Sequence, residues 1–387
     1  MNKKELELYI HIPFCVRKCS YCDFLSAPAT EQTREAYMAA LFAEIGGRAK
    51  DYSDRTVTSI FIGGGTPSLL SGEQIGQLMD RIREQFAMAQ DAEITMEVNP
   101  GTASAEKLRN FYTAGINRLS IGMQSAQAEE LKNLGRIHDF EGFCQVYREA
   151  VEAGFTNINV DIMSGLPGQT LASYRDTLEK VLHLEPMPQH ISAYSLIVEE
   201  GTPFAAMAER GELPLPEEET ERAMYEETIE VLAKYGFHRY EISNYARDGY
   251  ECRHNVGYWI RRDYLGFGIG AASLIDNVRF QNEKSLRTYL AHPLESREEE
   301  QTLTVQDRME ETMFLGLRLT RGVSCVDFAE QYGRTVEEVY GEVIARNVAD
   351  GLLTVTERKE NQKKDRLLAL TKRGLDLSNY VMAQFLF

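Results

Sequence analysis

Residues 11–24 read HIPFCVRKCSYCDF and hold three of the six cysteines of the chain in a Cys-x3-Cys-x2-Cys spacing, directly after an apolar run at residues 8–12. Three thiolates on one short loop can converge on one metal centre, and soft sulfur ligands select zinc or iron-sulfur clusters. A structural zinc ion needs a fourth ligand, and no Cys or His follows closely, since position 24 is Phe24. A cluster held by three residues leaves one iron open for a small molecule. The predicted cluster ligands are Cys15, Cys19 and Cys22.

Short β-branched runs recur along the chain before helical patterns, at residues 8–12, 58–62, 94–98, 118–121, 157–162 and 190–194. Between them lie segments whose apolar residues recur at helical spacing. Six strands, each followed by a helix, predict an α/β fold with a parallel sheet. Polar residues stand at the ends of several strands, which favours a barrel-like wheel over a doubly wound sheet, because barrel strand ends point at one centre.

The length of 387 residues predicts two or three domains. We assign residues 1–240 to the barrel and residues 241–300 to an aromatic and glycine-rich extension packed on it. The charged stretch 297–301 is predicted to be a linker or a solvated loop. Residues 301–387 show three helical patterns and two β-type runs at 352–356 and 366–370, which predict a small winged-helix-like α+β domain.

The formal charge of −17 argues against a nucleic acid partner, since phosphate backbones repel an acidic surface. Winged helices often bind DNA, but residues 301–387 carry 12 Lys and Arg against 13 Asp and Glu. A packing or lid role therefore outweighs DNA binding for this domain. No run resembles a signal peptide or a spanning helix, so a cytoplasmic location is expected. The other three cysteines are scattered singly, which does not indicate a disulfide framework.

A glycine segment follows the second predicted strand, where residues 60–67 read IFIGGGTP. Glycines allow close backbone approach and leave amide donors available, which suits the charged amino acid end of a ligand or a phosphate. A tight strand-to-helix turn explains such a run equally well on its own. With a cysteine loop one strand earlier, Gly64, Gly65 and Thr66 become candidate ligand contacts.

Three further strands end in polar residues: Glu97 in MEVNP, Gln124 in IGMQS and Asp161 in NVDIM. Each alone is explained equally well as a helix cap or a solvated loop residue. Together they occupy corresponding positions at the mouth of a barrel, where polar groups suit a ligand better than core packing.

The cysteine triplet, with Tyr21 just before its last member, resembles the radical S-adenosylmethionine (SAM) superfamily. The resemblance implies a partial (β/α)6 barrel and a [4Fe-4S] cluster whose unique iron binds the amino acid end of SAM. It also implies transfer of one electron to SAM, which cleaves a carbon-sulfur bond and gives methionine and a 5′-deoxyadenosyl radical. The SAM contacts that the resemblance implies are Tyr9, Tyr21, Gly64, Gly65, Thr66, Glu97, Gln124, Arg136 and Asp161. From its own surroundings, Arg136 could instead be a surface residue that neutralises carbonyls at a helix end.

Within this superfamily the chain is most similar to the HemN/HemW branch, which includes oxygen-independent coproporphyrinogen III oxidases and HemW-type haem chaperones. The oxidase pattern has one more cysteine at position 24 and a longer segment before the first strand, so both departures argue against coproporphyrinogen oxidation. Residues 253–259 read RHNVGYW and are similar to the H-N-x-x-Y-W signature of the HemW-type chaperones. The haem-binding candidates are His254, Tyr258 and Trp259. A histidine simply hydrogen-bonded in an aromatic loop is the other interpretation of His254.

The resemblance implies a haem chaperone that binds a [4Fe-4S] cluster, SAM and haem and delivers haem to acceptor proteins. Respiratory membrane proteins are the acceptors that it suggests, with contact at the membrane surface during delivery, and it allows a homodimer. The alternative is a radical SAM enzyme that acts on a porphyrin or a related substrate. The residues leave open whether SAM is cleaved at all.

Overall fold

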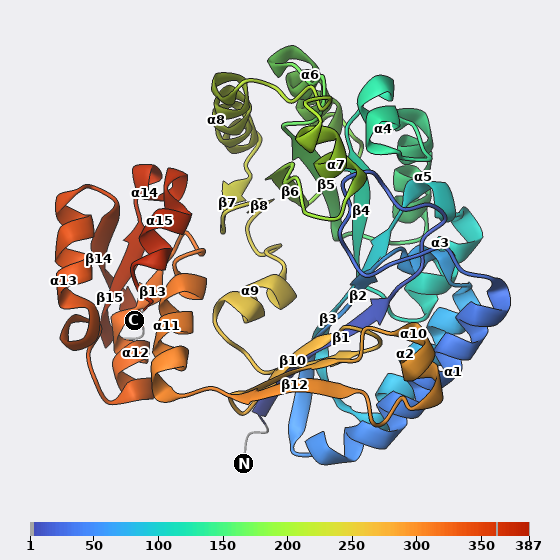
Figure 1. Cartoon of the computed structure of the whole chain (residues 1–387), viewed down its shortest axis with the longest axis horizontal. Coiled ribbons are helices and arrows are strands. Elements are labelled where there is room, and N and C mark those ends of the chain that lie inside the picture. The colour runs from blue at the N-terminus through green and yellow to red at the C-terminus, as the bar shows by residue number, and fades with distance from the viewer. Residues whose placement is uncertain (1–3, 361–362, 387) are drawn as a thin grey trace.

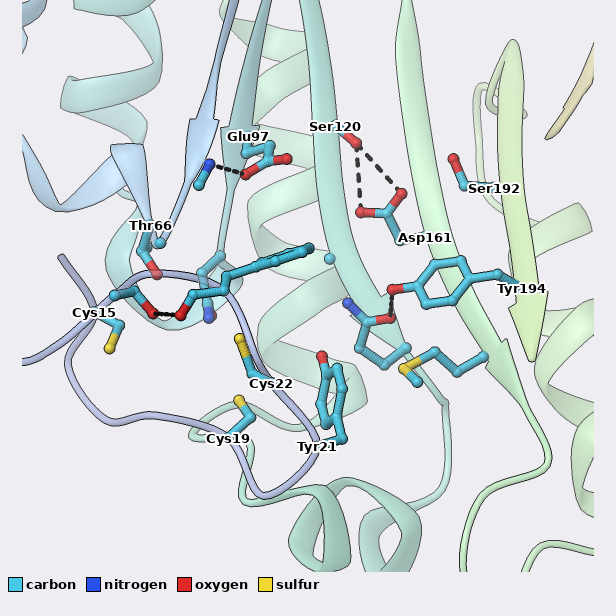
Figure 2. Close-up of a pocket in the computed structure, with 18 of the residues that line it drawn as sticks. Cys15, Cys19, Tyr21, Cys22, Thr66, Glu97, Ser120, Asp161, Ser192 and Tyr194 are labelled. Carbon is cyan, nitrogen blue, oxygen red and sulfur yellow. Dashed lines mark hydrogen bonds between the residues drawn. The ribbon is translucent and has the colours of Figure 1, made fainter. Parts of the chain in front are cut away.

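The computed structural model describes residues 4–360 and 363–386. Its centre is a 12-stranded sheet in which six neighbouring strands run parallel in chain order (Figure 1). These strands are β1 (Lys4–Ile12), β2 (Arg55–Gly64), β3 (Ala87–Val98), β4 (Arg118–Gln124), β5 (Ile158–Ser164) and β6 (His190–Ser195). The six predicted strands and the partial (β/α)6 barrel are confirmed. The carboxyl ends of these strands lie together and surround the pocket drawn in Figure 2.

Helices follow each of these strands and cover the outside of the curved sheet (Figure 1). They are α1 (Glu31–Arg48), α2 (Gly72–Gln85), α3 (Ala105–Thr113), α4 (Ala128–Leu134), α5 (Phe140–Glu152), α6 (Leu171–Leu182), α7 (Pro203–Glu209) and α8 (Glu218–Lys234). Short 3-10 turns lie at Ala49–Tyr52, Pro67–Leu69 and Pro100–Thr102. No helix within 4–360 and 363–386 is long and apolar enough to span a membrane.

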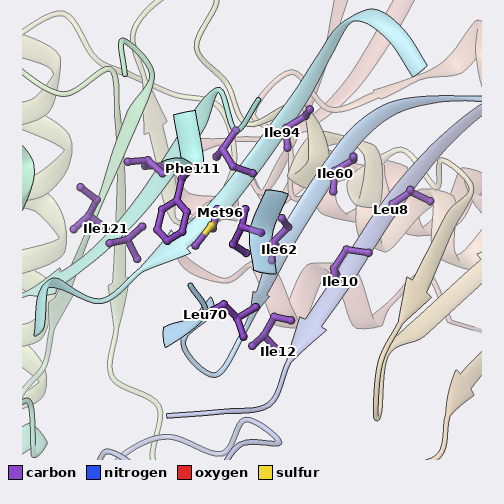
Figure 3. Packing of buried hydrophobic residues seen from close by; sticks show 14 of the residues in the cluster. Leu8, Ile10, Ile12, Ile60, Ile62, Leu70, Ile94, Met96, Phe111 and Ile121 are labelled. Atoms are coloured by element: carbon purple, nitrogen blue, oxygen red, sulfur yellow. The ribbon is translucent and has the colours of Figure 1, made fainter. Parts of the chain in front are cut away.

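The main core lies between the parallel strands and their outer helices (Figure 3). From Leu6 onward, every second residue of β1, including Leu8, Ile10 and Ile12, is completely buried in this core. Because side chains alternate between the two faces of a strand, Tyr9 and His11 point to the opposite face, where they line a cavity. One face of β1 therefore packs in the core, and the other faces the inside of the barrel.

The extension after the barrel adds strands to both ends of the large sheet. At one end, β8 (Asn244–Ala246) pairs with β6 and β7 (His238–Arg239) pairs with β8, both antiparallel. At the other end, β9 (Tyr264–Phe267) pairs parallel with β1, and three antiparallel strands follow it. The other elements are α9 (Arg253–Trp259), β10 (Ala272–Ile275), β11 (Val278–Asn282), α10 (Leu286–Ala291) and β12 (Arg297–Thr302).

The prediction that residues 297–301 form a linker or solvated loop is wrong. These residues belong to β12, the outermost strand of the large sheet, and all six of its side chains are exposed. Charged residues on an edge strand discourage pairing with another chain. Such a strand has the composition of a loop, which explains the error.

The C-terminal elements form a second group beside α9, drawn in orange and red in Figure 1. They are α11 (Val305–Gly316), β13 (Val323–Ser324), α12 (Cys325–Tyr332), α13 (Val336–Ala349), β14 (Leu353–Glu360), β15 (Lys363–Leu370), α14 (Lys372–Asp376) and α15 (Ser378–Ala383). Its three strands form a small antiparallel sheet over a separate hydrophobic cluster, so the winged-helix-like α+β fold is confirmed. The exact domain limits at residues 240 and 300 stay predictions.

A buried charged network joins α1 to the extension. The carboxylate of Glu44 is 0% exposed and accepts hydrogen bonds from the Gly268 amide at 2.9 Å, Asn282 Nδ2 at 2.7 Å and the Tyr289 hydroxyl at 2.6 Å. Arg48 Nη1 lies 2.8 Å from the same carboxylate and also donates to Asn282 at 2.9 Å. The partners of Glu44 outside α1 are Gly268, Asn282 and Tyr289, which all belong to the extension.

Removing the cation of this network should destabilise the protein strongly. Arg48→Met keeps the apolar stem but leaves the buried carboxylate of Glu44 without its counter-charge, which costs about 3 to 5 kcal/mol in the free energy of unfolding. Urea unfolding of the full chain measures this loss. The control Arg81→Met removes an exposed ion pair with Glu84 on α2 and should change the value by less than about 0.5 kcal/mol. Equal losses in the two variants would contradict the role of the network.

Candidate functional site

One cavity of about 490 Å³ opens at the carboxyl ends of the parallel strands (Figure 2). The cysteine loop after β1, the glycine segment after β2 and polar side chains from β3 to β6 all contribute to its wall. The predicted residues that line it are Cys15, Cys19, Tyr21, Cys22, Gly64, Gly65, Thr66, Glu97, Gln124, Arg136 and Asp161. Tyr9 is the exception among the predicted cluster and SAM residues, since it lines a neighbouring cavity.

The cysteine loop is held against the barrel by backbone hydrogen bonds. The Cys15 amide donates to the Ala27 carbonyl at 3.2 Å, and the Ser20 amide donates to the Leu134 carbonyl, at the end of α4, at 3.0 Å. Burial raises the pKa of the thiols of Cys15 and Cys22. A bound cation or metal would therefore have to stabilise the thiolates.

The three thiols share a cavity but do not form a compact single-ion site. Within the described parts of the chain, no three His, Cys, Asp or Glu side chains lie close enough together to hold one metal ion. One zinc ion would require such a group. In an iron-sulfur cluster each thiolate binds a different iron, so the sulfur atoms stand further apart. The three cysteines nevertheless line one cavity.

The glycine segment lies in close contact with the cysteine loop. The Gly65 amide donates to the Ile12 carbonyl at 2.8 Å, and a Cβ on Gly65 would lie 2.5 Å from the Phe14 carbonyl oxygen. Gly64 has φ of +112°, and its amide donates to Glu97 Oε2 at 3.0 Å. Both glycines are thus required by local packing, whether or not their backbone also contacts a ligand.

Two partly buried carboxyl groups, Glu97 and Asp161, line this cavity from β3 and β5. Burial, assisted by the nearby charge of Asp161, raises the pKa of Glu97 to about 8. Burial also raises the pKa of Asp161, although Asn159 Nδ2 donates to it at 2.7 Å and Ser120 Oγ at 3.3 Å. Neither carboxylate has an ion pair among the described residues. A cationic ligand would remove the cost of ionising them.

Gln124 and Arg136 complete the polar wall. Gln124 adopts a left-handed φ of +69°, and its Oε1 accepts a hydrogen bond from the Tyr194 hydroxyl at 2.9 Å. Arg136 donates from Nη2 to the Gly122 carbonyl at 2.7 Å, and its Nη1 lies 3.9 Å from Cys19 Sγ. Its buried Nε finds no hydrogen-bond partner in the described chain. The structure therefore places Arg136 in the cavity rather than at an exposed helix end.

Several polar residues of this wall were not predicted from the sequence. They are Ser120, Asn159, Ser192 and Tyr194, all on β4 to β6. Each stands at an alternate position from a predicted residue or from another member of this set, as the two-residue period of a strand requires. The spacing of Asn159 and Asp161 was the signal that could have identified them.

A second cavity of about 540 Å³ adjoins the first, and Phe24, Gly64 and Glu97 line both. Its wall is rich in aromatic and apolar side chains. The members from the barrel, α9 and the extension include Tyr9, His11, Leu25, Tyr258, Trp259, Tyr264, Leu274 and Arg279. Leu315 of α11 adds a contribution from the C-terminal domain. Apart from the shared Gly64 and Glu97, the predicted ligand contacts on this wall are Tyr9, Tyr258 and Trp259.

His254 lies behind this second cavity rather than on its wall. Its side chain is 1% exposed, its Nδ1 lies 2.9 Å from Ser59 Oγ and its Nε2 lies 3.0 Å from the Tyr258 hydroxyl. Its ring packs beside Phe61 with the ring centres 5.3 Å apart. This placement matches the alternative interpretation, a hydrogen-bonded histidine in an aromatic environment. Haem binding by His254 stays a prediction.

Comparisons with known proteins agree with this arrangement. A family model described as the radical SAM superfamily matches residues 9–181, and one described as the HemN C-terminal domain matches residues 303–377. A Bacillus subtilis protein named heme chaperone HemW is 38% identical over 98% of this chain and 98% of its own length. The chain belongs to the HemW family of the radical SAM superfamily. The predicted resemblance is confirmed.

Other HemW proteins show the same degree of similarity. The one from Lactococcus lactis is 36% identical over 100% of this chain and 98% of its own length. Among solved structures, the coproporphyrinogen III oxidase HemN of Escherichia coli, described as a radical SAM enzyme, superimposes with a TM-score of 0.84 at 28% identity. The match covers 99% of this chain and 90% of HemN, so the HemW and HemN folds agree over nearly the whole chain.

The partly buried carboxyl of Glu97 should make stability depend on pH. Burial raises its pKa from 4.5 to about 8, so ionisation disfavours the folded state as the pH rises through this range. Relative to Glu97→Gln, the parent protein should therefore lose stability between about pH 5 and pH 8, with a slope of at most about 1.4 kcal/mol per pH unit. Urea unfolding of cluster-free protein at several pH values measures this difference. A difference that stays constant over the range would contradict the assigned burial.

Proposed function

We propose that this HemW-family protein binds a [4Fe-4S] cluster and SAM in the first cavity, binds haem in the second, and delivers haem to acceptor proteins. The observation that carries the proposal is the pair of adjoining cavities. One holds thiols and carboxylates, the other is aromatic, and they share Phe24, Gly64 and Glu97. The relatives named heme chaperone HemW support this division of the site.

The cluster would be held by Cys15, Cys19 and Cys22. Their shared cavity suits a cluster, and the Arg136 guanidinium beside Cys19 would stabilise the negative charge of a bound thiolate. When bound, such a cluster would be able to supply one electron to SAM for cleavage of its carbon-sulfur bond. The contribution of the protein would be to hold the thiolates at the mouth of the barrel.

The same cavity suits the charges of SAM, which carries a sulfonium and an ammonium group together with a carboxylate. Glu97 and Asp161 have no ion pair among the described residues, so they can balance the positive groups. The unpartnered Nε of Arg136 can donate to a carboxylate. Tyr21, Gly64, Gly65, Thr66 and Gln124 remain the other proposed SAM contacts, since they line the same cavity.

The second cavity suits a flat, largely apolar ligand with carboxylates at its rim. A volume of about 540 Å³ lies within the usual range of ligand sites. Trp259 and Tyr258 offer ring faces for stacking, and Arg279 supplies a cation for a haem propionate. Tyr9, which was predicted to contact SAM, belongs to this wall in the structure.

The C-terminal domain is positioned to cover the second cavity. Glu311 of α11 pairs with Arg261 at 2.8 Å and with Arg279 at 2.8 Å. The Arg318 guanidinium, just after α11, lies 4.3 Å from the centre of the Trp259 ring. These contacts support a packing or lid role for this domain, as predicted from its nearly equal numbers of acidic and basic residues. Haem transfer would then require this domain to move or to contact the acceptor.

For the acceptors of haem, we propose a class of proteins and no individual protein. Haem-binding proteins of the respiratory membrane are the acceptors that the family resemblance suggests, with peripheral membrane contact of an otherwise cytoplasmic protein. A homodimer is a further proposed assembly. Light scattering of the full chain with reconstituted cluster tests the homodimer. Pull-down of the protein onto vesicles of bacterial lipid tests the membrane contact.

A porphyrin-modifying radical enzyme is the second candidate function, and the HemN superposition at a TM-score of 0.84 favours it. Against it, Phe24 occupies the position of the extra cysteine of the oxidase pattern and is 59% exposed. An anaerobic assay with reconstituted cluster, dithionite, SAM and coproporphyrinogen III separates the two functions. Stoichiometric vinyl formation would establish the enzyme.

Loss of one thiolate should abolish the cluster. Cys19→Ala leaves two cysteines, which cannot retain a [4Fe-4S] cluster, so anaerobic reconstitution should give less than about a tenth of the parent iron and sulfide content and no cluster absorption. The matched control is Cys144→Ala on α5, outside both cavities, which should reconstitute like the parent. Unchanged iron and sulfide in Cys19→Ala would refute the cluster assignment.

Loss of the indole should weaken haem binding. Trp259→Leu removes a stacking face from the second cavity, so we expect the Kd of ferric haem to rise about tenfold, equivalent to 1.4 kcal/mol. Absorbance titration of the full chain measures the Kd. The control Tyr380→Leu removes an aromatic ring that is 61% exposed on α15, away from the cavity. Equal affinities of Trp259→Leu and the parent protein would remove Trp259 from the haem site.

A further inference from the structure

The end of β4 holds Gln124 in an unusual backbone conformation. The register between β4 and β5 shifts by one residue between Gly122 and Gln124, and Gln124 has a φ of +69°, in the left-handed region that residues other than glycine seldom adopt. A bulge of this kind re-aims a side chain, and its strain persists only where the surroundings hold it in place. Gln124 is 4% exposed and lines the first cavity. The contacts of its side chain therefore show what holds it at the cavity wall.

A side chain from β6 reaches across β5 to Gln124. The Tyr194 hydroxyl donates a hydrogen bond to Gln124 Oε1 at 2.9 Å (Figure 2). A phenol keeps its proton at neutral pH, so it can act as the donor. Tyr194 pairs in register with Met163 of β5, and its ring packs against an apolar cluster that includes Met163 and Leu134. Apolar packing thus holds the ring, and the ring holds the hydroxyl on the amide oxygen.

This hydrogen bond determines which way round the Gln124 amide lies. With the oxygen bonded to Tyr194, the NH2 group lies over Gly122, where a Cβ would be 3.0 Å from Gln124 Nε2. Among residues 4–360 and 363–386, Tyr194 is the one hydrogen-bond partner of this side chain. Both N–H bonds of the amide therefore remain available to a ligand in the first cavity.

The surroundings of the Gln124 NH2 group favour an acceptor atom on that ligand. Arg136 Nη2 lies on the same side of Gly122, since the Cβ placed there would be 3.1 Å from it. The Gly122 carbonyl already accepts a hydrogen bond from Arg136 Nη2 at 2.7 Å, so this acceptor is occupied. The groups left without a partner here are N–H donors. SAM carries carboxylate, hydroxyl and ring nitrogen acceptors that can bind such donors.

We propose that Tyr194 is a positioning residue for SAM, because its hydroxyl fixes the Gln124 side chain so that Gln124 Nε2 donates to an acceptor atom of SAM. This inference rests on the proposed binding of SAM in the first cavity. Without the hydroxyl the amide can rotate, and SAM binding must then include the cost of fixing it. SAM should bind more weakly as a result. The cluster should still assemble, since its three cysteines lie on the loop after β1.

The test is equilibrium dialysis of SAM against the full chain with reconstituted cluster, without a reductant, so that SAM is not cleaved. Tyr194→Phe should raise the Kd of SAM about fivefold, as expected for the loss of one hydrogen bond. The matched control is Tyr147→Phe, which removes a buried hydroxyl that donates to the Pro186 carbonyl at 2.7 Å and lines neither cavity. Its Kd should equal that of the parent protein. An unchanged Kd in Tyr194→Phe would overturn the positioning role.

A double-mutant cycle separates positioning from direct contact, because Tyr194 itself lines the first cavity. Gln124→Met keeps the length of the side chain but removes the amide, so it should weaken SAM binding on its own. In the Gln124→Met background, Tyr194→Phe should cause no further rise of the Kd, since no amide is left to position. A fivefold rise in both backgrounds would show that Tyr194 contacts SAM directly, and the proposal would be wrong.

Two controls distinguish this outcome from damage to the cluster and from failure of the proposed function. Without SAM, the parent protein and Tyr194→Phe should have equal iron and sulfide contents and the same electron paramagnetic resonance spectrum after reduction with dithionite. An altered spectrum in Tyr194→Phe would show that the hydroxyl acts on the cysteine loop, against the proposal. Failure of the parent protein to bind SAM would overturn the proposed function itself, whereas equal binding by the parent protein and Tyr194→Phe would overturn only the role of Tyr194.

Discussion

The close approach between the glycine segment of β2 and the start of the cysteine loop determines where the site forms. Gly65 donates to Ile12 at 2.8 Å, and the Phe14 carbonyl occupies the space where a Cβ of Gly65 would stand. Only glycine allows this contact without moving the loop. Because Cys15 follows Phe14 directly, the contact also places the first thiol at the end of β2. The cluster loop is thus positioned by backbone packing before any cofactor binds.

The inward faces of the strands supply the rest of the chemistry by simple alternation. In β1, one face contributes to the main core while Tyr9 and His11 line the second cavity. In β5, Asn159 and Asp161 line the first cavity while the residues between and beside them are buried in the core. A strand that packs well on its helix side therefore presents every second residue to the barrel interior. Polar residues at those inward positions line the cavity rather than the core.

Much of the fold and of the first cavity could be predicted from the sequence, because the patterns that indicate them lie in short segments. The cysteine spacing, the strand-helix alternation and the residues at the strand ends are all contained in short segments, and the structure brings them to one cavity. The placements of Tyr9 and His254 were less predictable, because they depend on how α9 and the extension pack on β1 and β2. The edge strand β12 was misassigned because exposed charges on an edge resemble a solvated loop. Long-range packing therefore accounts for most of what sequence patterns missed.

Phe24 shows how closely the two cavities depend on each other. It lies two residues after Cys22, is 59% exposed, and lines both cavities, while its neighbour Leu25 lines the second and accepts a hydrogen bond from His11. A cysteine at this position would offer a fourth thiol to the first cavity, whereas phenylalanine extends the aromatic wall of the second. Only a few backbone bonds separate Cys22 from Phe24, so the positions of the cysteine loop and of this wall are linked. The cysteine loop therefore contributes to the walls of both cavities.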